Sequence, residues 1–356
     1  MCTQILGELA SIVGANGLLL EDAAAPFLVD WRGRYTGRAQ AVVRPGNVQE
    51  VAAVMQVCAR HGTPVVPQGG NTGLCGGATP DESGEAIVLS LTRLNAVRSI
   101  DTDNDTMVVD AGCTLSAVQE AARACGRLFP LSLAAEGTCT IGGNLATNAG
   151  GTQVLRYGNA RDLALGLEVV TPDGEIWNGL RGLRKDNTGY DLRDLYIGSE
   201  GTLGVITGAT LKLYPMPAAQ RTAILALASV DDAVRLLSRA RKGFGPSLTA
   251  FEVMAGSVLH DVVRLFPPQR LPFEGPSAVA SYFALLELSD MESEEHAQAQ
   301  FENVLGVAME EGLILDAVIA ESMTQSKAFW HLRESIPLAE ADPGKSIKHD
   351  VSVPIS

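Results

Sequence analysis

The chain has 356 residues, of which 46% are hydrophobic and 19% charged, a profile typical of a folded protein large enough for two domains. The formal net charge of −14 argues against binding to nucleic acid or to an anionic membrane, because both require a basic face. No apolar run reaches the length of a membrane span and no secretory signal is visible, so we expect a soluble cytoplasmic protein.

The cysteines and histidines indicate neither disulfides nor a metal site. The six cysteines are dispersed and contain no CxxC pair, so we expect reduced thiols in the core. The five histidines lie far apart, and no two of them have the spacing of metal ligands. The histidines are His61, His260, His296, His331 and His349.

The first hundred residues read as an α+β unit. A short strand over 41–44 precedes a helix that Asn47 and Glu50 can begin as a capping box. The apolar face of this helix would consist of Val51, Val54, Met55 and Cys58. Gly62 suits the position after the helix, and a strand over 64–67 then runs into a glycine-rich loop.

The first glycine-rich loop reads VVPQGGNTGLCGG over residues 65–77. Glycine lets amide N–H groups approach a ligand closely, and consecutive exposed amides form concave anion sites. The loop contains neither GxxxxGK[ST] nor a GxGxxG that opens a helix, which weakens the P-loop and Rossmann interpretations. The alternative is a plain connector between strands. Five glycines in nine residues, with Asn71 and Thr72 as side-chain donors, favour a pyrophosphate cradle.

Further strands are predicted at 86–91 and 107–109. Thr114 can cap a helix that Gly126 ends. The inward residues of this helix would be Leu115, Val118, Ala122 and Cys125. A second glycine-rich segment, AEGTCTIGGNLATNAGGT, covers residues 135–152 and offers amides and polar side chains to the same ligand.

The remaining chain alternates between strands and helices. A strand over 163–171, a Pro-Asp-Gly turn and a pair of strands over 202–207 and 209–214 lead to a domain boundary at Pro215-Met216-Pro217. Such alternation beyond it suits a ferredoxin-like sheet covered by helices on one face. The predicted elements there are strands at 223–227, near Phe251, 278–288 and 313–319, and helices at 231–240, near His260 and at 292–312.

Six segments of the chain together resemble FAD-linked dehydrogenases of the vanillyl-alcohol oxidase superfamily, nearest to the D-2-hydroxyacid dehydrogenase branch. That branch includes D-2-hydroxyglutarate and D-lactate dehydrogenases and the flavin subunit of glycolate oxidase. The resemblance runs from about Asp30 to the last residue. The segments are DWRGRYTGRA (30–39), the two glycine-rich ones, RYGNARDL (156–163), RKDNTGYDL (184–192) and IGSEGTLGVIT (197–207).

The resemblance implies an α+β fold in two domains. Residues 1–215 would form an FAD-binding domain of the vanillyl-alcohol oxidase type, with subdomains at about 1–100 and 101–215. Residues 216–356 would form a ferredoxin-like substrate (cap) domain, incomplete at the C-terminus.

The resemblance also implies FAD as the cofactor, with its diphosphate wrapped by the first glycine-rich loop. Some superfamily members attach FAD through a histidine in this loop, where this chain has Asn71, so we expect non-covalent FAD. We expect a left-handed backbone at Gly143, where a bulky side chain should abolish FAD binding. A surface loop at 136–152 and a hairpin at 200–206 are the alternatives. The residues implied in FAD binding are Pro67, Gly69, Gly70, Asn71, Thr72, Gly73, Leu74, Ser132, Gly137, Thr138, Ile141, Gly142, Gly143, Asn144, Thr147, Gly151, Glu200, Gly201, Gly204 and Ile206.

Arg333 and Lys348 are the residues that the resemblance implies in catalysis, by binding the substrate carboxylate. Arginine's planar fork suits a bidentate carboxylate, and lysine adds a point charge. An arginine on a helix is otherwise most often solvated. Pro337 stands one turn later, where some relatives have a hydroxyl side chain, and Ser335 could substitute for it.

The chain ends in a predicted strand, IKHDVSVPIS over 347–356, where the family continues with a histidine pair around a Gly-Asp-Gly-Asn motif. We therefore expect a truncated chain. In the family, the catalytic base and the divalent metal that polarises the substrate hydroxyl depend on that later segment, so we expect no metal ligands in this chain.

These observations predict an FAD-dependent dehydrogenase that oxidises a D-2-hydroxyacid, of the D-2-hydroxyglutarate or D-lactate type, to the 2-oxo acid by hydride transfer to flavin N5. The alternatives are an FAD-dependent oxidase of alcohols or sugars, which would not need both Arg333 and Lys348, and a non-catalytic flavoprotein subunit of an electron-transfer complex. A quinone, an electron-transferring flavoprotein, a cytochrome or oxygen is open as electron acceptor, and a homodimer is compatible with the sequence.

Overall fold

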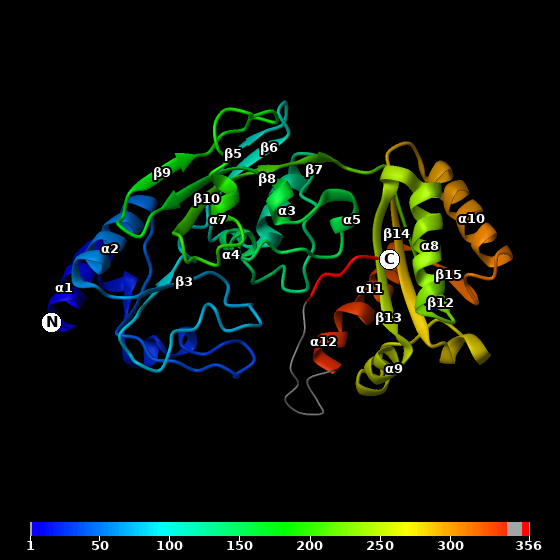
Figure 1. The fold of residues 1–356 in the computed structure, drawn as a ribbon, viewed down its shortest axis with the longest axis horizontal. Helices are drawn as coiled ribbons and strands as arrows, with labels where there is room; N and C mark the ends of the chain where they lie inside the picture. The colour runs from blue at the N-terminus through cyan, green and yellow to red at the C-terminus, as the bar shows by residue number, and fades with distance from the viewer. Residues whose placement is uncertain (1, 340–350, 356) are drawn as a thin grey trace. The chain divides into compact units, whose positions relative to one another are not determined.

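The computed structural model describes residues 2–339 and 351–355. The chain divides into two compact units, each with its own hydrophobic core (Figure 1). The first unit is Met1–Gly151 together with Tyr157–Met216, and the second is Thr152–Arg156 together with Pro217–Ser356. In the part of the chain that the structure describes, no helix is long and apolar enough to cross a membrane.

The first unit begins with a four-stranded sheet in the order β1-β2-β4-β3, in which β2, β4 and β3 are parallel. Parallel neighbours need a crossover connection. Helix α2 makes the crossover between β2 and β3, whereas a glycine-rich loop without a helix joins β3 to β4. The elements here are α1 (Cys2–Val13), η1 (Ala15–Gly17), β1 (Leu18–Leu19), η2 (Glu21–Ala23), η3 (Ala25–Phe27), β2 (Ala41–Val43), α2 (Val48–His61), β3 (Val65–Gln68) and β4 (Ile87–Ser90).

Helix α2 confirms the helix predicted after residue 47. Asn47 Oδ1 accepts a hydrogen bond from Glu50 N at 2.9 Å, and Gly62 ends the helix in the left-handed region with φ of 63°. The predicted apolar face is buried in the core of the unit: Val51, Val54, Met55 and Cys58.

The second sheet of this unit is antiparallel, in the order β5-β6-β10-β8-β9. The predicted helix capped by Thr114 is confirmed as α3, because Thr114 Oγ1 accepts from Ala117 N at 3.3 Å. The elements here are β5 (Val97–Asp101), β6 (Thr106–Asp110), α3 (Leu115–Ala124), β7 (Arg127–Leu128), α4 (Ile141–Ala146), α5 (Val154–Tyr157), α6 (Ala160–Leu163), β8 (Ala164–Val170), β9 (Ile176–Gly179), α7 (Arg193–Tyr196), β10 (Val205–Lys212) and β11 (Tyr214–Pro215).

The predicted pair of strands over 202–207 and 209–214 is wrong, because residues 205–212 form the single strand β10, which continues through Gly208. A Cβ at Gly208 would lie 3.0 Å from Arg98 Nη2, so the glycine makes room for the Arg98 guanidinium inside a continuous strand. Arg98 in turn bonds Asp110 and Glu168 on the neighbouring strands, at 2.6 and 2.8 Å.

The second unit contains an antiparallel sheet in the order β13-β14-β12-β15. The chain order β12-α8-β13, then β14-α10-β15, together with this strand order is the ferredoxin-like arrangement. Helix α9 is inserted between β13 and β14, and α11 and α12 follow β15. The elements are β12 (Ala219–Leu227), α8 (Val230–Phe244), η4 (Gly245–Ser247), β13 (Leu248–Ala255), α9 (Gly256–Leu265), η5 (Gly275–Val279), β14 (Tyr282–Asp290), α10 (Glu294–Glu310), β15 (Asp316–Ile319), α11 (Met323–Glu334) and α12 (Ile336–Ala339).

Helices cover both faces of this sheet, which corrects the prediction of one covered face. Helices α8 and α10 pack on one face, and α9, α11 and α12 pack on the other (Figure 1). On β12, Ala223 and Leu225 point to the first face while Ile224 and Ala226 point to the second. A strand with both faces buried reads as a continuous apolar run rather than an alternating one.

Two further expectations need correction. Residues 351–355 form no strand, because their apolar side chains lie exposed without a neighbouring strand to pair with, and the rest of the terminal strand predicted over 347–356 lies outside the described residues. Among the cysteines whose side chains are described, all are free thiols, but Cys75 is exposed rather than in the core, because it lies on the glycine-rich loop.

Candidate functional site

The base of the first glycine-rich loop is fastened by two amide side chains. Gln68, buried at the end of β3, donates from Nε2 to Phe27 O at 2.9 Å and to Ala78 O at 2.8 Å, and so joins both ends of the loop. Asn71 has a left-handed backbone, with φ of 52°, and donates from Nδ2 to Val29 O at 2.8 Å. One N–H of its side-chain amide therefore fixes the loop.

The backbone amides of this loop have no partners. Among the described residues, no hydrogen bond is donated by the N–H group of any residue from 69 to 77. Gly69 and Gly70 are half-buried, and shielding an N–H group from water without a partner costs about 1–3 kcal/mol. A run of nine backbone amides without hydrogen-bond partners fits an anion held by backbone dipoles.

The second glycine-rich segment lies directly against this loop. A Cβ at Gly69 would lie 2.3 Å from Thr140 Oγ1, and a Cβ at Gly70 would lie 1.9 Å from Thr138 O. Only glycine fits at Gly70, where the clash is with backbone, whereas a side chain at Gly69 would have to displace the Thr140 hydroxyl. Thr140 Oγ1 is buried and has no hydrogen-bond partner, so a buried polar atom faces the place where the two segments meet.

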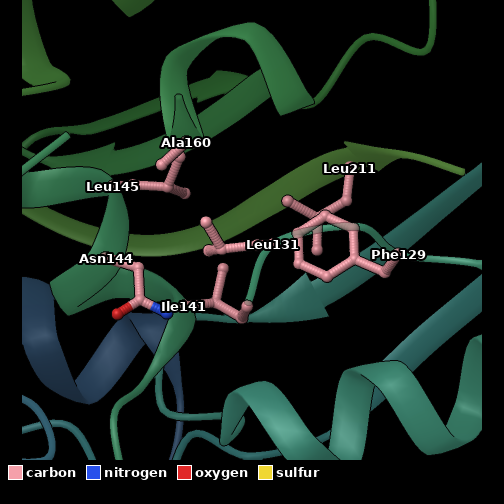
Figure 2. Close-up of a pocket in the computed structure, with 7 residues that line it drawn as sticks. All are labelled: Phe129, Leu131, Ile141, Asn144, Leu145, Ala160 and Leu211. Atoms are coloured by element: carbon pink, nitrogen blue, oxygen red, sulfur yellow. The ribbon is translucent and has the colours of Figure 1, made fainter. Parts of the chain in front are cut away.

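Helix α4 carries the second segment and is seated on a packed core. Figure 2 shows side chains of α4 turned toward a cavity of about 10 Å³, which is at the lower limit for one water molecule. The Asn144 side chain is 5% exposed and donates to Cys139 Sγ at 3.6 Å. Asn144 therefore anchors helix α4 to the core, and its side chain is buried. The cavity is lined by Phe129, Leu131, Ile141, Asn144, Leu145, Ala160 and Leu211.

Three glycines of the two segments face open space. A Cβ at Gly73 or Gly137 would meet nothing within 4 Å, and at Gly143 it would meet only Thr140 Oγ1 at 3.4 Å. Gly143 belongs to α4 and has a helical backbone, so the left-handed conformation predicted for it is wrong. Its lack of a side chain leaves room above the helix without relieving any backbone strain.

The third predicted segment joins the other two. Gly198 N and Glu200 N donate to the carbonyls of Leu145 and Ala146 at 3.0 and 2.9 Å, which ties the segment to α4. Glu200 takes a left-handed backbone with φ of 53°. A Cβ at Gly201 would lie 3.1 Å from the ring of Pro67, at the entrance of the first loop. We call these three segments, residues 67–77, 132–151 and 198–206, the cradle.

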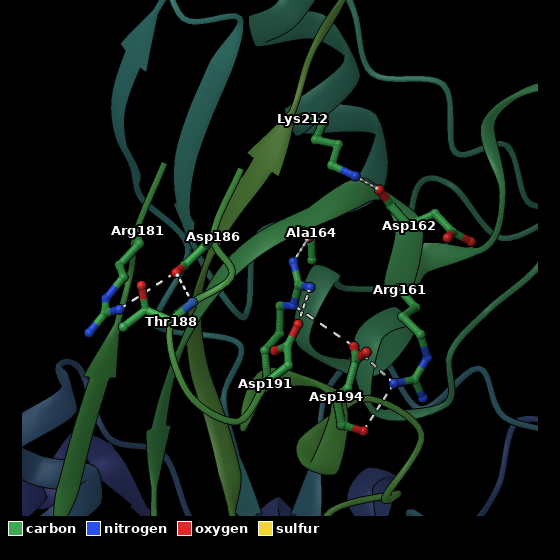
Figure 3. Close-up of polar contacts among 10 residues, drawn as sticks. Arg161, Asp162, Ala164, Arg181, Asp186, Thr188, Asp191, Asp194 and Lys212 are labelled. Carbon is green, nitrogen blue, oxygen red and sulfur yellow. Dashed lines mark hydrogen bonds and ion pairs between the residues drawn. The ribbon is translucent and has the colours of Figure 1, made fainter. Parts of the chain in front are cut away.

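Two arginines that the sequence analysis missed hold the stretch of chain that leads into the third segment. Arg161, labelled in Figure 3, donates to Asp194 O at 2.9 Å and to Ile197 O at 2.7 Å, and its backbone N–H donates to Asn148 Oδ1 at 3.1 Å. Arg193 donates to Ala164 O at 2.5 Å. Arg161 thus links the second segment of the cradle to the residues directly before the third. The sequence signal for Arg161 was its position in RYGNARDL, one of the six segments that resemble the family, to which no role was assigned.

The other positions predicted to bind FAD differ in burial and in their hydrogen bonds. Ser132 lies beside Gly151, where a Cβ would be 2.3 Å from Ser132 O, and Leu74 is exposed at the loop. The Ile206 side chain is buried in the core of the unit, so it supports β10 from inside. The Thr147 hydroxyl donates to Gly143 O at 3.0 Å within α4.

The second unit carries the predicted substrate residues. Arg333 lies on α11, as predicted, and its Nε donates to Glu252 Oε2 on β13 at 2.8 Å. Lys348 lies outside the described residues. Ser335 is 2% exposed, and its hydroxyl accepts a hydrogen bond from Gln269 Nε2 at 2.7 Å. This buried hydroxyl is already paired within the unit, so it does not substitute for the hydroxyl side chain that some relatives have at the position of Pro337.

A buried acid close to Arg333 went unnoticed in the sequence. Glu287 lies in the middle of β14, and its Oε2 accepts from Trp330 Nε1 at 2.8 Å and from Thr222 Oγ1 at 3.3 Å. Burial raises the pKa of Glu287, while the two donors act against that shift. The only signal was a glutamate inside an apolar strand. In the described part of the chain, no group of three or more His, Cys, Asp and Glu side chains could hold a metal ion.

Comparisons with known proteins match both halves of the chain. Residues 39–179 match the FAD binding domain family, and residues 216–356 match the C-terminal domain of FAD linked oxidases. The chain is 41% identical over 331 residues to the D-2-hydroxyglutarate dehydrogenase of Xanthomonas citri pv. viticola, which covers 92% of this chain and 67% of that protein. The chain belongs to the FAD-linked dehydrogenase family. It is a flavoprotein of the α+β fold found in the vanillyl-alcohol oxidase superfamily.

Other members of the family differ in name and length. The bovine mitochondrial D-2-hydroxyglutarate dehydrogenase is 37% identical over 352 residues, 98% of this chain and 63% of that protein. A putative D-lactate dehydrogenase of Schizosaccharomyces pombe is 35% identical over 356 residues, 97% of this chain and 66% of that protein. The chain spans 61% of the length of its match in Oryza sativa, a probable D-2-hydroxyglutarate dehydrogenase.

Solved structures agree on the fold. Alkyldihydroxyacetonephosphate synthase has a TM-score of 0.74 at 19% identity, covering 95% of this chain and 63% of that one. p-Cresol methylhydroxylase has a TM-score of 0.74 at 17% identity, covering 94% and 68%. The cradle fits the FAD of this family, because its unpartnered amides suit a diphosphate and its open glycines leave space above α4.

Proposed function

We propose that the complete protein is an FAD-dependent dehydrogenase that oxidises a D-2-hydroxyacid to the 2-oxo acid. The observation that carries the proposal is the cradle, which combines nine backbone amides without partners and three glycines that border open space, in a chain of this family. Bound FAD supplies the hydride acceptor. The choice of a D-2-hydroxyacid is supported by relatives named D-2-hydroxyglutarate dehydrogenase and D-lactate dehydrogenase.

In this proposal the cradle binds the cofactor through its backbone. The amides of residues 69–77 hold the diphosphate, and Gly143 leaves the space that the cofactor occupies. The buried hydroxyl of Thr140 supplies one further polar group where the two glycine-rich segments meet. No histidine is present in the loop, which supports a non-covalent cofactor.

In the second unit, Arg333 would bind the carboxylate of the substrate and Lys348 would add a second positive charge. Two positive charges favour an acid over a neutral alcohol or sugar, which separates this proposal from an oxidase of neutral substrates. A base and a divalent metal, if the complete protein uses them, would come from residues beyond those described.

The proposal is tested on the complete protein with an artificial dye as electron acceptor. We expect dye reduction with D-2-hydroxyglutarate or D-lactate, and far less with the L-enantiomers or with neutral alcohols and sugars. Turnover of neutral alcohols alone would favour an oxidase. A protein that binds FAD and reduces no dye with any hydroxyacid would favour a non-catalytic flavoprotein subunit.

The non-covalent cofactor is tested on the same preparation. Acid precipitation should release all of the yellow chromophore into the supernatant, because no residue of the loop can form the histidyl bond. Chromophore retained in the pellet would contradict the proposal. The absence of a flavin spectrum even after reconstitution with FAD would argue against the cradle itself.

A further inference from the structure

One face of α11 is joined to the sheet by a line of polar contacts. Ser326, Trp330 and Arg333 follow one another at i, i+4 and i+7, the spacing of one helix face. Each contacts a polar side chain on a different strand: Thr222 on β12, Glu287 on β14 and Glu252 on β13. We call these six residues the α11 seam.

The first two contacts of the seam fix the helix. Ser326 Oγ and Thr222 Oγ1 lie 2.8 Å apart, and the Trp330 indole donates to Glu287 at 2.8 Å. Glu287 is 6% exposed, so sliding or rotating α11 would remove the Trp330 donor and leave a buried carboxylate with only Thr222. Buried polar groups of this kind set the register of packed elements, because only one arrangement satisfies them.

The third contact orients a charge. A guanidinium has five N–H donors in a rigid plane, one on Nε and four on Nη1 and Nη2. Glu252 accepts from Nε alone, and no hydrogen bond within the described residues uses the other nitrogens of Arg333. The Arg333 side chain is 32% exposed and that of Glu252 is 24% exposed, so the outer edge of the guanidinium remains accessible.

We infer that Glu252 is a positioning residue, which holds the guanidinium of Arg333 by Nε so that Nη1 and Nη2 present a bidentate edge to the substrate carboxylate. The inference rests on the proposed function. A fixed fork binds a carboxylate more tightly than a mobile one, because less side-chain entropy is lost on binding. The ligand class is therefore an acid, bound through its carboxylate on the outer edge of Arg333.

The test compares three substitutions of Glu252 in the complete protein, with D-2-hydroxyglutarate and D-lactate as substrates. Glu252→Ala removes the acceptor for Nε, and we expect KM to rise about tenfold with kcat nearly unchanged, as for a lost ground-state contact. Glu252→Gln keeps an acceptor and removes only the charge, so it should keep KM within about threefold of the wild type. Glu252→Asp keeps the charge but moves the acceptor away from Arg333 Nε by one methylene, and should also raise KM. This variant keeps the inference testable if Glu252→Ala does not fold.

Glu311→Ala is the matched control. Glu311 pairs with Arg239 in the same unit, and both partners are partly exposed in similar measure, but this pair lies at the α8 and α10 face. We expect this variant to leave KM unchanged. If the Glu252–Arg333 pair served stability alone, Glu252→Ala would lower the midpoint of thermal unfolding, and it would not raise KM selectively over its effect on kcat.

The outcomes distinguish this inference from the proposed function. If Arg333→Lys raises KM while Glu252→Ala does not, the positioning role is overturned and the proposed function stands. If Glu252→Gln raises KM as much as Glu252→Ala, charge rather than hydrogen bonding matters and the positioning role is again overturned. If neither acid is turned over by the wild type, the proposed function fails, and the inference fails with it.

Discussion

The cradle offers its backbone to a ligand, whereas the α11 seam offers a side chain. In the cradle, the amide side chains of Asn71 and Asn144 turn inward and fasten the segments, and the backbone faces outward. In the seam, the backbone lies in helix α11 and in the strands of the sheet, and the guanidinium of Arg333 is the group available to a ligand. Added side chains should therefore damage the cradle, whereas exchanged side chains should damage the seam.

The largest effect is expected from Gly70→Ala. The added methyl group would lie 1.9 Å from Thr138 O, where backbone meets backbone and neither segment can yield without moving. We expect the loss of FAD together with a destabilisation of roughly 1–3 kcal/mol, the usual cost of overpacking. Flavin content and thermal unfolding of the purified variant measure the two effects. Unchanged values for both would show that the first two segments of the cradle do not meet as described.

Gly143→Ala should lower the affinity for FAD without lowering the stability of the FAD-free protein. Alanine is preferred over glycine in a helix by about 1 kcal/mol, and the added methyl group meets only Thr140 Oγ1, at 3.4 Å. The FAD-free variant should therefore unfold at the same temperature as the wild type or a higher one. Its affinity for FAD should fall at least tenfold, and further for Gly143→Val, if the cofactor occupies the space above α4. Flavin titration of the FAD-free protein gives the affinity, and wild-type affinity in both variants would place the cofactor elsewhere.

Local sequence signals accounted for much of the fold. Asn47 and Thr114 fixed the starts of two helices, because a cap needs only a few neighbouring residues. The strand pair predicted on either side of Gly208 was wrong, since the sequence contains no sign that Arg98, more than a hundred residues away, needs the space beside this glycine. The second helical layer on the sheet of the second unit was predictable in principle from the unbroken apolar run at 223–227 in β12.

The site was predictable as segments and much less so as contacts. Glycine density pointed to the cradle because a close approach of two backbones leaves no alternative to glycine. The direction of each polar side chain depends on tertiary partners, so the anchoring bonds of Asn71 to Val29 O and of Asn144 to Cys139 Sγ could not be predicted from the sequence. Glu252 and Glu287 stand in strands without any local pattern, and only packing shows that they contact α11.

Arg333→Lys should damage the seam while it leaves the cradle intact. Lysine keeps the charge, but it has neither the Nε that donates to Glu252 nor a bidentate edge. We expect kcat/KM for a 2-hydroxyacid to fall by roughly ten- to a hundredfold, the equivalent of about 1.5–3 kcal/mol for a charge-assisted contact. FAD content should not change, because Arg333 and the cradle belong to different units. Unaltered kinetics with every acid would remove Arg333 from the site, and a loss of FAD would point to a structural role.

The smallest effect is expected from Glu287→Gln, and it should depend on pH. Burial raises the pKa of Glu287 above its ordinary value of 4.5. A raised pKa in the folded state contributes stability that is complete below pH 4.5 and is lost as the pH rises through the folded-state pKa. Glutamine keeps an acceptor for Trp330 but has no such loss, so the variant should gain stability relative to the wild type as the pH rises from about 4.5 toward neutrality.

A difference on the order of 1 kcal/mol would shift Tm by roughly 2–4 °C for a unit of this size. Thermal unfolding of both proteins across this pH range measures it. Glu310→Gln, an exposed position on α10, provides the control and should follow the wild type at every pH. If the Tm difference between wild type and Glu287→Gln stayed constant with pH, Glu287 would not be held in the low-dielectric interior that its contacts with Trp330 and Thr222 describe. The seam would then owe its register to the packing of Phe329 and Leu332 rather than to a buried carboxylate.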